Sequence, residues 1–247
     1  MVSPEFILTA RICTVKPQWE LFVASVNLAK NGEPQYHPIM NIFREGDLAL
    51  LQIHPHITES PTGYRRIPLY DGSVGVRKLV TIAGWDNNGT ESKLRETEIP
   101  IFSEKMCGNM LAKIGYTITK KNFCTFDEHR VKGCTHEDSG SALVAEGRLL
   151  GVLIFAGTDL PGPPLPDVFI RVNDQNEYYL WIKIIIGEKL YNANQFIQHP
   201  YYYPLLQYHP QIQTLHYSPG SDKLFVHPHP SHYSHAPRDP PHTVIHV

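Results

Sequence analysis

The chain has 247 residues, of which 42% are hydrophobic and 19% are charged, and its formal net charge at pH 7 is −2. A charge this close to zero, without a long basic run, gives no reason to expect a nucleic acid or an anionic membrane as a partner. No apolar run approaches the roughly 20 residues that cross a bilayer, because the isoleucine cluster at residues 184–186 is too short.

Runs rich in β-branched and aromatic residues predict β-strands, and clusters of glycine and proline separate them. In chain order these runs are residues 21–26, 48–53, 78–83, 149–155 and 168–172. At residues 177–186 apolar side chains recur at spacings of three and four, which predicts a helix, and Gly187 stands where that helix would end. Many short strands with one terminal helix are typical of an all-β sandwich or barrel.

The segment after residue 187 has a different composition. It holds nine of the 14 histidines together with many prolines and tyrosines. Frequent proline, low charge and little apolar periodicity favour an extended or disordered tail. Clustered imidazoles leave metal capture or pH-dependent association open, and a mis-annotated reading frame is a further alternative. We therefore divide the chain into a folded domain at residues 1–187 and a His/Pro/Tyr-rich tail at 188–247.

A series of motifs in the folded part shares its order with one known family. The motifs are FILTARIC at residues 6–13, EGDLALLQI at 45–53, IAGW at 82–85, IPI at 99–101 followed by Cys107, CTHEDSGSAL at 134–143, PDVFIRV at 166–172 and YLWI at 179–182. Together they resemble the trypsin/chymotrypsin family of serine peptidases. The resemblance implies two six-stranded antiparallel β-barrels and a C-terminal helix. Few residues precede the first motif, so we expect the first barrel to be truncated.

Three positions decide whether this resemblance extends to catalysis. It places Ser139 at the nucleophile, Asp47 at the aspartate that orients the base, and Ile12 at the catalytic histidine. Isoleucine can neither accept a proton nor form a hydrogen bond, so the serine hydroxyl lacks the base that activates it. We expect Asp47 to be a relic, and we expect His136, three residues before the serine, to be a solvated loop residue.

The oxyanion hole departs from the family as well. The resemblance assigns it to the backbone of Glu137 and Ser139, and the family has a glycine at the first of these positions. A glutamate carboxylate there would repel a developing oxyanion by about 4 kcal/mol at ~4 Å and an effective dielectric constant near 20. One extra residue between Cys134 and Ser139 leaves the alignment of residues 135–137 open, but none of them is glycine.

The substrate-binding positions also differ. The family strand that pairs with the substrate corresponds to Ile154, Phe155 and Ala156, and Lys132 or Gly133 falls near the floor of the specificity pocket. A side chain in place of the family glycine narrows this pocket. An acidic floor suited to basic side chains is absent, so the sequence predicts no substrate preference.

The cysteines and one sequon favour an extracellular protein. The resemblance pairs Cys107 with Cys124 in a disulfide and leaves Cys13 and Cys134 without partners. Asn88 begins the sequon Asn-Gly-Thr, a glycosylation acceptor in secreted proteins. The amino terminus lacks the charged and apolar regions of a signal peptide. We nevertheless expect a secreted protein.

Three hypotheses for the function follow from these observations. The first is a catalytically inactive serine protease homologue that acts as a protein-binding or regulatory module in an extracellular proteolytic cascade. The second is an active serine endopeptidase that hydrolyses peptide bonds through Ser139 with a base of another kind. The third is a truncated product without function. We expect no cofactor and no metal, and we expect a protein partner such as a protease or its substrate.

Overall fold

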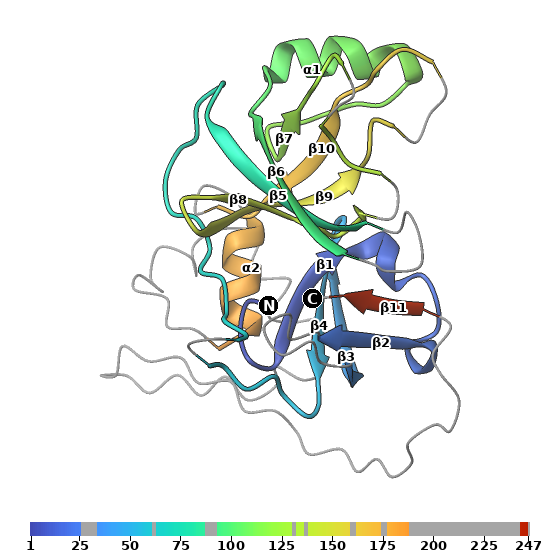
Figure 1. Ribbon diagram of the computed structural model, residues 1–247, viewed down its shortest axis with the longest axis vertical. Coiled ribbons are helices and arrows are strands. Elements are labelled where there is room, and N and C mark those ends of the chain that lie inside the picture. The colour runs from blue at the N-terminus through green and yellow to red at the C-terminus, as the bar shows by residue number, and fades with distance from the viewer. Residues whose placement is uncertain are drawn as a thin grey trace, which may run out of the picture. The chain divides into compact units, whose positions relative to one another are not determined.

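The computed structural model describes nine stretches of the chain. They are residues 1–25, 34–60, 63–86, 93–129, 132–135, 138–158, 162–173, 177–187 and 243–246. The chain divides into one unit made of Met1–Tyr179 with Pro241–Val247 and a second unit, Leu180–Pro240. The first unit contains two β-sheets and the helix α1 (Glu104–Leu111) (Figure 1). The mostly β, trypsin-like architecture expected from the sequence is confirmed.

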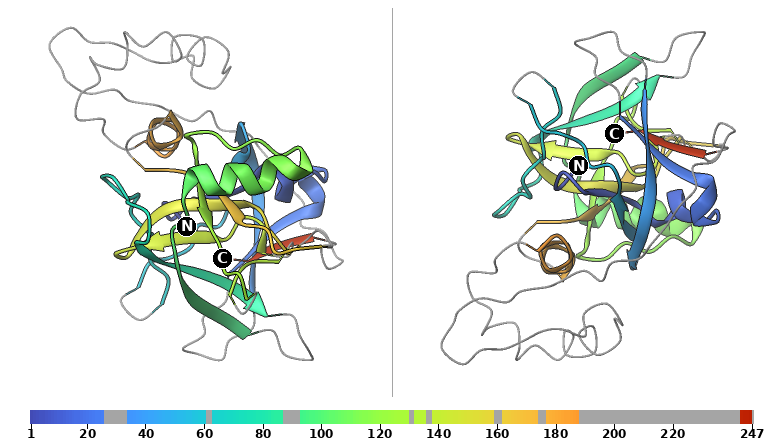
Figure 2. Two further views of the ribbon diagram at one scale, coloured as in Figure 1. Left: turned by 90° about the horizontal axis from the view of Figure 1, so that it is seen from above. Right: turned by 90° about the horizontal axis from the view of Figure 1, so that it is seen from below.

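The first sheet has five strands in the described residues, in the order β1-β4-β3-β2-β11. Their bounds in that order are Phe6–Ala10, Leu48–Ile53, Gln35–Glu45, Leu21–Ser25 and Thr243–His246. The strand β11 comes from the segment that the sequence analysis assigned to the tail. It pairs in parallel with β2, with Thr243 opposite Leu21, and the two views of Figure 2 show it beside that strand.

The strand β4, which pairs with β1 and β3, is buried on both faces, because Leu48 to Leu51 are all fully covered. A run without polar alternation is what a strand with two covered faces requires. One face packs into an apolar cluster with neighbouring strands. Its buried members are Ile7, Leu21, Val23, Ile39, Ala49, Leu51, Ile53 and Ile57.

The second sheet has six strands in the order β6-β5-β8-β9-β10-β7. Their bounds in that order are Lys93–Pro100, Leu79–Asp86, Ala142–Ala145, Arg148–Phe155, Asp167–Arg171 and Asn122–Thr125. The hairpin between β8 and β9 turns at Glu146 and Gly147, which both have positive φ, as the twist of a two-residue hairpin favours. The apolar core of this second sheet includes Ile99, Phe123, Leu143, Leu150, Leu153 and Phe169.

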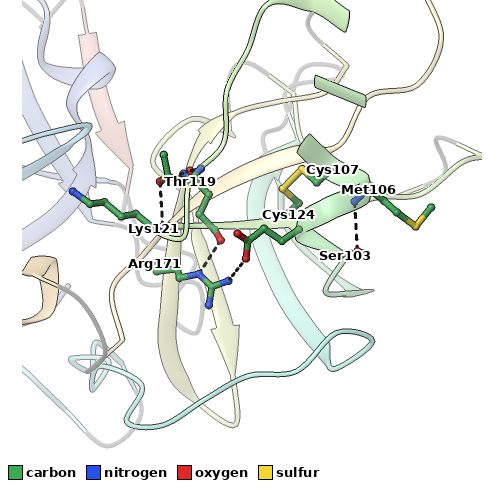
Figure 3. Close-up of polar contacts among 9 residues, drawn as sticks. Ser103, Met106, Cys107, Thr119, Lys121, Cys124 and Arg171 are labelled. Carbon is green, nitrogen blue, oxygen red and sulfur yellow. Dashed lines mark hydrogen bonds and ion pairs between the residues drawn. A yellow bond between two sulfur atoms is a disulfide. The ribbon is translucent and has the colours of Figure 1, made fainter. Parts of the chain in front are cut away.

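The helix α1 is joined covalently to the second sheet. The backbone N–H of Met106 donates to the Ser103 hydroxyl at 3.5 Å, so this serine caps the amino end of the helix. Cys107 in α1 forms a disulfide with Cys124 in β7 (Figure 3). The pairing that the resemblance implied is therefore confirmed.

The short helices complete the described elements. They are the 3-10 turns η1 (Arg11–Thr14), η2 (Gln18–Glu20) and η4 (Ala112–Ile114), and the α-helix α2 (Glu177–Ile185). The predicted terminal helix matches α2, and Gly187 beyond it has the positive φ of a helix end. In the described part of the chain, no helix combines the length and hydropathy needed to cross a membrane.

Candidate functional site

The loop that carries Ser139 is held by Asp138. The Asp138 carboxylate accepts hydrogen bonds from the Thr135 N–H at 2.7 Å and from the Thr135 hydroxyl at 2.9 Å. Its other oxygen lies so close to Gly84 in β5 that a Cβ there would be 2.2 Å away, so a side chain at that position would displace the carboxylate. The loop is thus ordered by its own residues and by β5.

The loop also contacts the first sheet. The Cys13 thiol donates to the Ser139 carbonyl at 3.2 Å, although 126 residues separate them. At Gly140, where φ is +90°, a Cβ would lie 2.3 Å from the Thr9 hydroxyl and 3.3 Å from the amide nitrogen of Ala10. The segment with Ile12 and the loop with Ser139 are therefore brought together, as the resemblance predicts.

The residue that the resemblance assigns to the histidine position is about half exposed to solvent. Ile12 lies in η1, directly before Cys13, and 51% of it is exposed. Its hydrocarbon side chain has no atom that can take the proton of a serine hydroxyl. The side chains around it that form hydrogen bonds are those of Arg11, Cys13 and Thr14.

The aspartate position lies in the turn between β3 and β4. Asp47 is exposed, and its carbonyl accepts the Arg11 N–H at 2.7 Å, while the Arg11 guanidinium donates to the Gly46 carbonyl at 3.3 Å. Because its carboxylate is in contact with water, the cost of a buried unpaired charge does not arise. The Asp47 charge adds to the burial that raises the pKa of the Tyr116 phenol. Its role as a relic stays a prediction.

Two assigned positions lie outside the described residues. They are Glu137, the predicted oxyanion-hole residue, and Asn88, the predicted glycosylation site. His136 also lies outside them. The roles assigned to these three residues therefore remain predictions from the sequence.

The predicted substrate-binding residues lie on two segments of the second sheet and its loops. Ile154 and Phe155 end β9, and the Phe155 ring packs against the Tyr116 ring with centroids 5.0 Å apart. Ala156 is buried directly after the strand. Lys132 donates through its ammonium group to the Glu98 carbonyl in β6 at 2.7 Å. This contact turns the lysine charge toward β6.

The site contains one buried charged residue that the sequence analysis did not single out. Asp167 begins β10, and only 4% of it is exposed. One carboxylate oxygen accepts the Gly157 N–H at 2.8 Å, and the other accepts the Cys134 N–H at 3.1 Å. Burial raises the pKa of the Asp167 carboxyl to about 6, and the hydrogen bonds to it act in the opposite direction. The available signal was the motif Pro-Asp-Val, where the resembled family has Pro-Gly-Val.

The two cysteines outside the disulfide, Cys13 and Cys134, occupy different surroundings. The Cys134 side chain is buried, and the Thr158 hydroxyl donates to the Cys134 carbonyl at 2.6 Å. Cys13 is partly buried, and this burial raises the pKa of its thiol. In the described residues, no group of three or more histidine, cysteine or acidic side chains is arranged to hold a metal ion.

Sequence comparisons agree with this architecture. Residues 1–182 match the family model described as Trypsin. The chain is 24% identical over 180 residues to a trypsin of Simulium vittatum, and the match covers 66% of this chain and 72% of that protein. It is 26% identical over 204 residues to brachyurin of Leptuca pugilator, with 76% and 86% of the two chains covered.

A solved structure has the same fold. The crystal structure of the scabies mite inactivated protease paralogue S-D1 superposes with a TM-score of 0.62 at 20% identity, and the match covers 77% of this chain and 86% of that one. The family match, the two sheets and the contact between the first-sheet segment and the serine loop all agree. The chain belongs to the trypsin/chymotrypsin family of serine proteases.

Proposed function

We propose that this chain is a non-catalytic serine protease homologue that binds a protein partner, such as a protease or its substrate, in an extracellular proteolytic cascade. The observation that carries this proposal is Ile12. Its side chain stands at the position of the general base, on the segment that contacts the Ser139 loop, and is half exposed to solvent. A serine hydroxyl without a base is a poor nucleophile at neutral pH.

The expected loss of catalytic rate is large enough to decide whether the chain is a slow enzyme or an inactive one. Removing one member of the catalytic triad lowers the rate by several orders of magnitude, which raises the barrier by on the order of 5 to 8 kcal/mol. Asp47 does not offset this loss, because a carboxylate that orients a base has no effect where the base is missing. We therefore expect no measurable turnover from Ser139.

The hydrogen bonds around Ser139 support a protein with a binding role over a truncated product without function. Asp138 is bonded to Thr135, and the Gly140 N–H donates to the Leu153 carbonyl in β9 at 2.9 Å. A chain without any function would have no reason to keep this geometry after losing its base. The disulfide between Cys107 and Cys124 supports an oxidising, extracellular compartment.

The relatives support the same proposal by analogy. The solved structure with the TM-score of 0.62 is that of an inactivated protease paralogue, so this fold also occurs in an inactivated relative of the proteases. In such a protein, the surface around the former active site remains available for contacts with other proteins.

The test is labelling with a fluorophosphonate probe, which reacts covalently only with an activated serine. The folded chain, its Ser139→Ala variant and an active trypsin are treated in parallel, and circular dichroism shows that both forms of this chain are folded. We expect labelling of trypsin alone. Labelling of this chain that disappears in Ser139→Ala would instead identify an active serine endopeptidase with an unrecognised base.

A further inference from the structure

Two segments that line the predicted binding site face each other and are held together by side chains. We call residues 132–135 the first wall and residues 154–158 the second wall. The Thr158 hydroxyl in the second wall donates to the Cys134 carbonyl in the first at 2.6 Å. In the resembled family a cysteine at the position of Cys134 forms a disulfide with this region, whereas the disulfide in the described residues joins Cys107 and Cys124 and does not include Cys134. Hydrogen bonds therefore replace the covalent link.

The strongest of these links is the carboxylate of Asp167. Its two oxygens accept one backbone N–H from each wall, that of Gly157 at 2.8 Å and that of Cys134 at 3.1 Å. The Thr125 hydroxyl in β7 lies 3.5 Å from the carboxylate, and the Cys134 thiol donates to it as well. A single side chain thus joins both walls and β7, and all of these donors are neutral.

A buried carboxylate that has only neutral donors holds its proton more firmly than one in water. Desolvation opposes the charge, and hydrogen bonds from amides and hydroxyls offset only part of this cost. When the walls separate, water reaches the carboxylate and its pKa returns toward the ordinary 3.8, from the value of about 6 in the closed site. The closed site therefore binds a proton that the open site releases.

We propose that Asp167 is a positioning residue that clasps the two walls together, so that the site is closed in acid and opens as the pH rises to neutral. This inference rests on the proposed function, because it assumes that the two walls border the surface that a partner occupies. An extracellular partner at neutral pH would then meet the open form, and an acidic compartment would favour the closed one.

The other titratable groups near the clasp are few in the described residues. On the first wall, the Lys132 ammonium donates to the Glu98 carbonyl, and the Lys132 N–H donates to the carboxylate of Asp127, which follows β7. On the adjoining loop the Asp138 carboxylate is bonded to Thr135. The second wall contributes an amide, β7 contributes a hydroxyl, and Cys134 contributes an amide and a thiol. Burial raises the pKa of the Asp167 carboxyl to about 6, between pH 4 and pH 7.

The Cys134 thiol reports directly on the clasp, because it is buried and bonded to Asp167. The full chain is labelled with 4,4′-dithiodipyridine, which reacts with thiols in acid as well as at neutral pH. Mass spectrometry then follows Cys134 and Cys13 separately. Each rate is divided by that of N-acetylcysteine at the same pH, which removes the pH dependence of the thiol itself.

We expect the normalised labelling rate of Cys134 to rise roughly 100-fold from pH 4 to pH 7.5, with its midpoint near pH 6. The reason is that a shift of about two pKa units in Asp167 changes the equilibrium between closed and open walls by that factor. Asp167→Asn cannot ionise and should give a flat profile. Asp71→Asn is the matched control, since this exposed acid pairs with Arg148 far from the clasp and should leave the profile unchanged. A flat wild-type profile, or an unchanged slope in Asp167→Asn, would overturn the inference.

Two further measurements keep the result interpretable. Amide hydrogen exchange at residues 149–153 of β9 must stay slow at the pH where Cys134 becomes reactive. If these amides exchange as fast as Cys134 is labelled, the whole domain unfolds, which contradicts a local opening of the two walls. If Asp167→Asn does not fold, Thr158→Val should speed Cys134 labelling at every pH and keep the slope. None of these readouts depends on Ser139, so the fluorophosphonate result and the clasp can fail separately.

Discussion

The Cys13 thiol donates a hydrogen bond to the backbone carbonyl of Ser139 at 3.2 Å. This bond links the segment that carries the base in active relatives to the loop that carries the nucleophile. The contact brings these two segments together although the isoleucine at position 12 has no atom that can act as a base. It therefore offers a direct way to ask how much the loop depends on its neighbours.

Replacing Cys13 by alanine leaves the Ser139 carbonyl without its thiol donor. We expect the free energy of unfolding to fall by about 1 to 3 kcal/mol, the range for a partly buried polar group that loses its partner. Urea unfolding measures the change. Cys13→Ser keeps a donor of similar size and should lose less, and equal stability of the alanine variant and the wild type would show that the bond contributes nothing.

Replacing Gly140 by alanine tests the approach of the serine loop to β1. The new Cβ would lie 2.3 Å from the Thr9 hydroxyl at a φ of +90°, so both a clash and backbone strain oppose it. We expect a loss of more than about 2 kcal/mol in the free energy of unfolding. Gly115→Ala is the matched control, because it also has positive φ but nothing within 4 Å, and it isolates the strain. Equal losses in the two variants would mean that the clash is relieved by movement of the loop.

Restoring the base at Ile12 tests whether it is the only defect. We expect Ile12→His not to restore hydrolysis of chromogenic peptide substrates, because Glu137 remains where the family has an oxyanion-hole glycine. The substrates should carry basic, aromatic and small side chains, so that a changed specificity is not mistaken for inactivity. Turnover that is lost again on adding Ser139→Ala would show that the remaining site is competent.

Stability should depend on pH through Asp167. Its pKa is about 6 in the folded chain and 3.8 in the unfolded chain, so the folded state binds more protons between these values. The contribution to stability is fully present below pH 3.8 and is lost as the pH rises through about 6. The difference corresponds to about 3 kcal/mol.

Urea unfolding of the wild type and of Asp167→Asn at pH 4 and pH 7 measures this contribution. Other groups titrate in the same range, so the quantity of interest is the difference between the two pH profiles. The gap between them should widen by about 3 kcal/mol across this range, with the wild type gaining stability in acid relative to the variant. Parallel profiles would rule out the assigned pKa.

Much of the fold was predictable from local patterns. The five predicted strands correspond to β2, β4, β5, β9 and β10, because their apolar runs are long enough to mark buried strands. The strand β6 was missed, since five of its eight residues are charged or threonine and its exposure to solvent removes the apolar pattern. The helix α1 was missed as well, because its eight residues include only four apolar ones and a glycine.

The candidate site was predictable to a smaller extent. The motif around Ser139 and its partner segment at residues 6–13 were found by sequence alone, and the structure brings them together. Asp167 was not found, because a single acid in an apolar strand gives no sign of which donors will surround it. Its hydrogen bonds reach 10 residues back to Gly157 and 33 residues back to Cys134. No local pattern contains such separations.

The sequence by itself determined that residue 139 is a serine and that residue 12 is an isoleucine, and the identity of a side chain decides whether it can accept a proton. Only the tertiary structure decided that Asp138 orders its own loop through Thr135 and that Asp167 joins two walls of the site. The ionisation of a carboxylate depends on its burial and on the donors that reach it. Both quantities arise only when distant segments of the chain pack together.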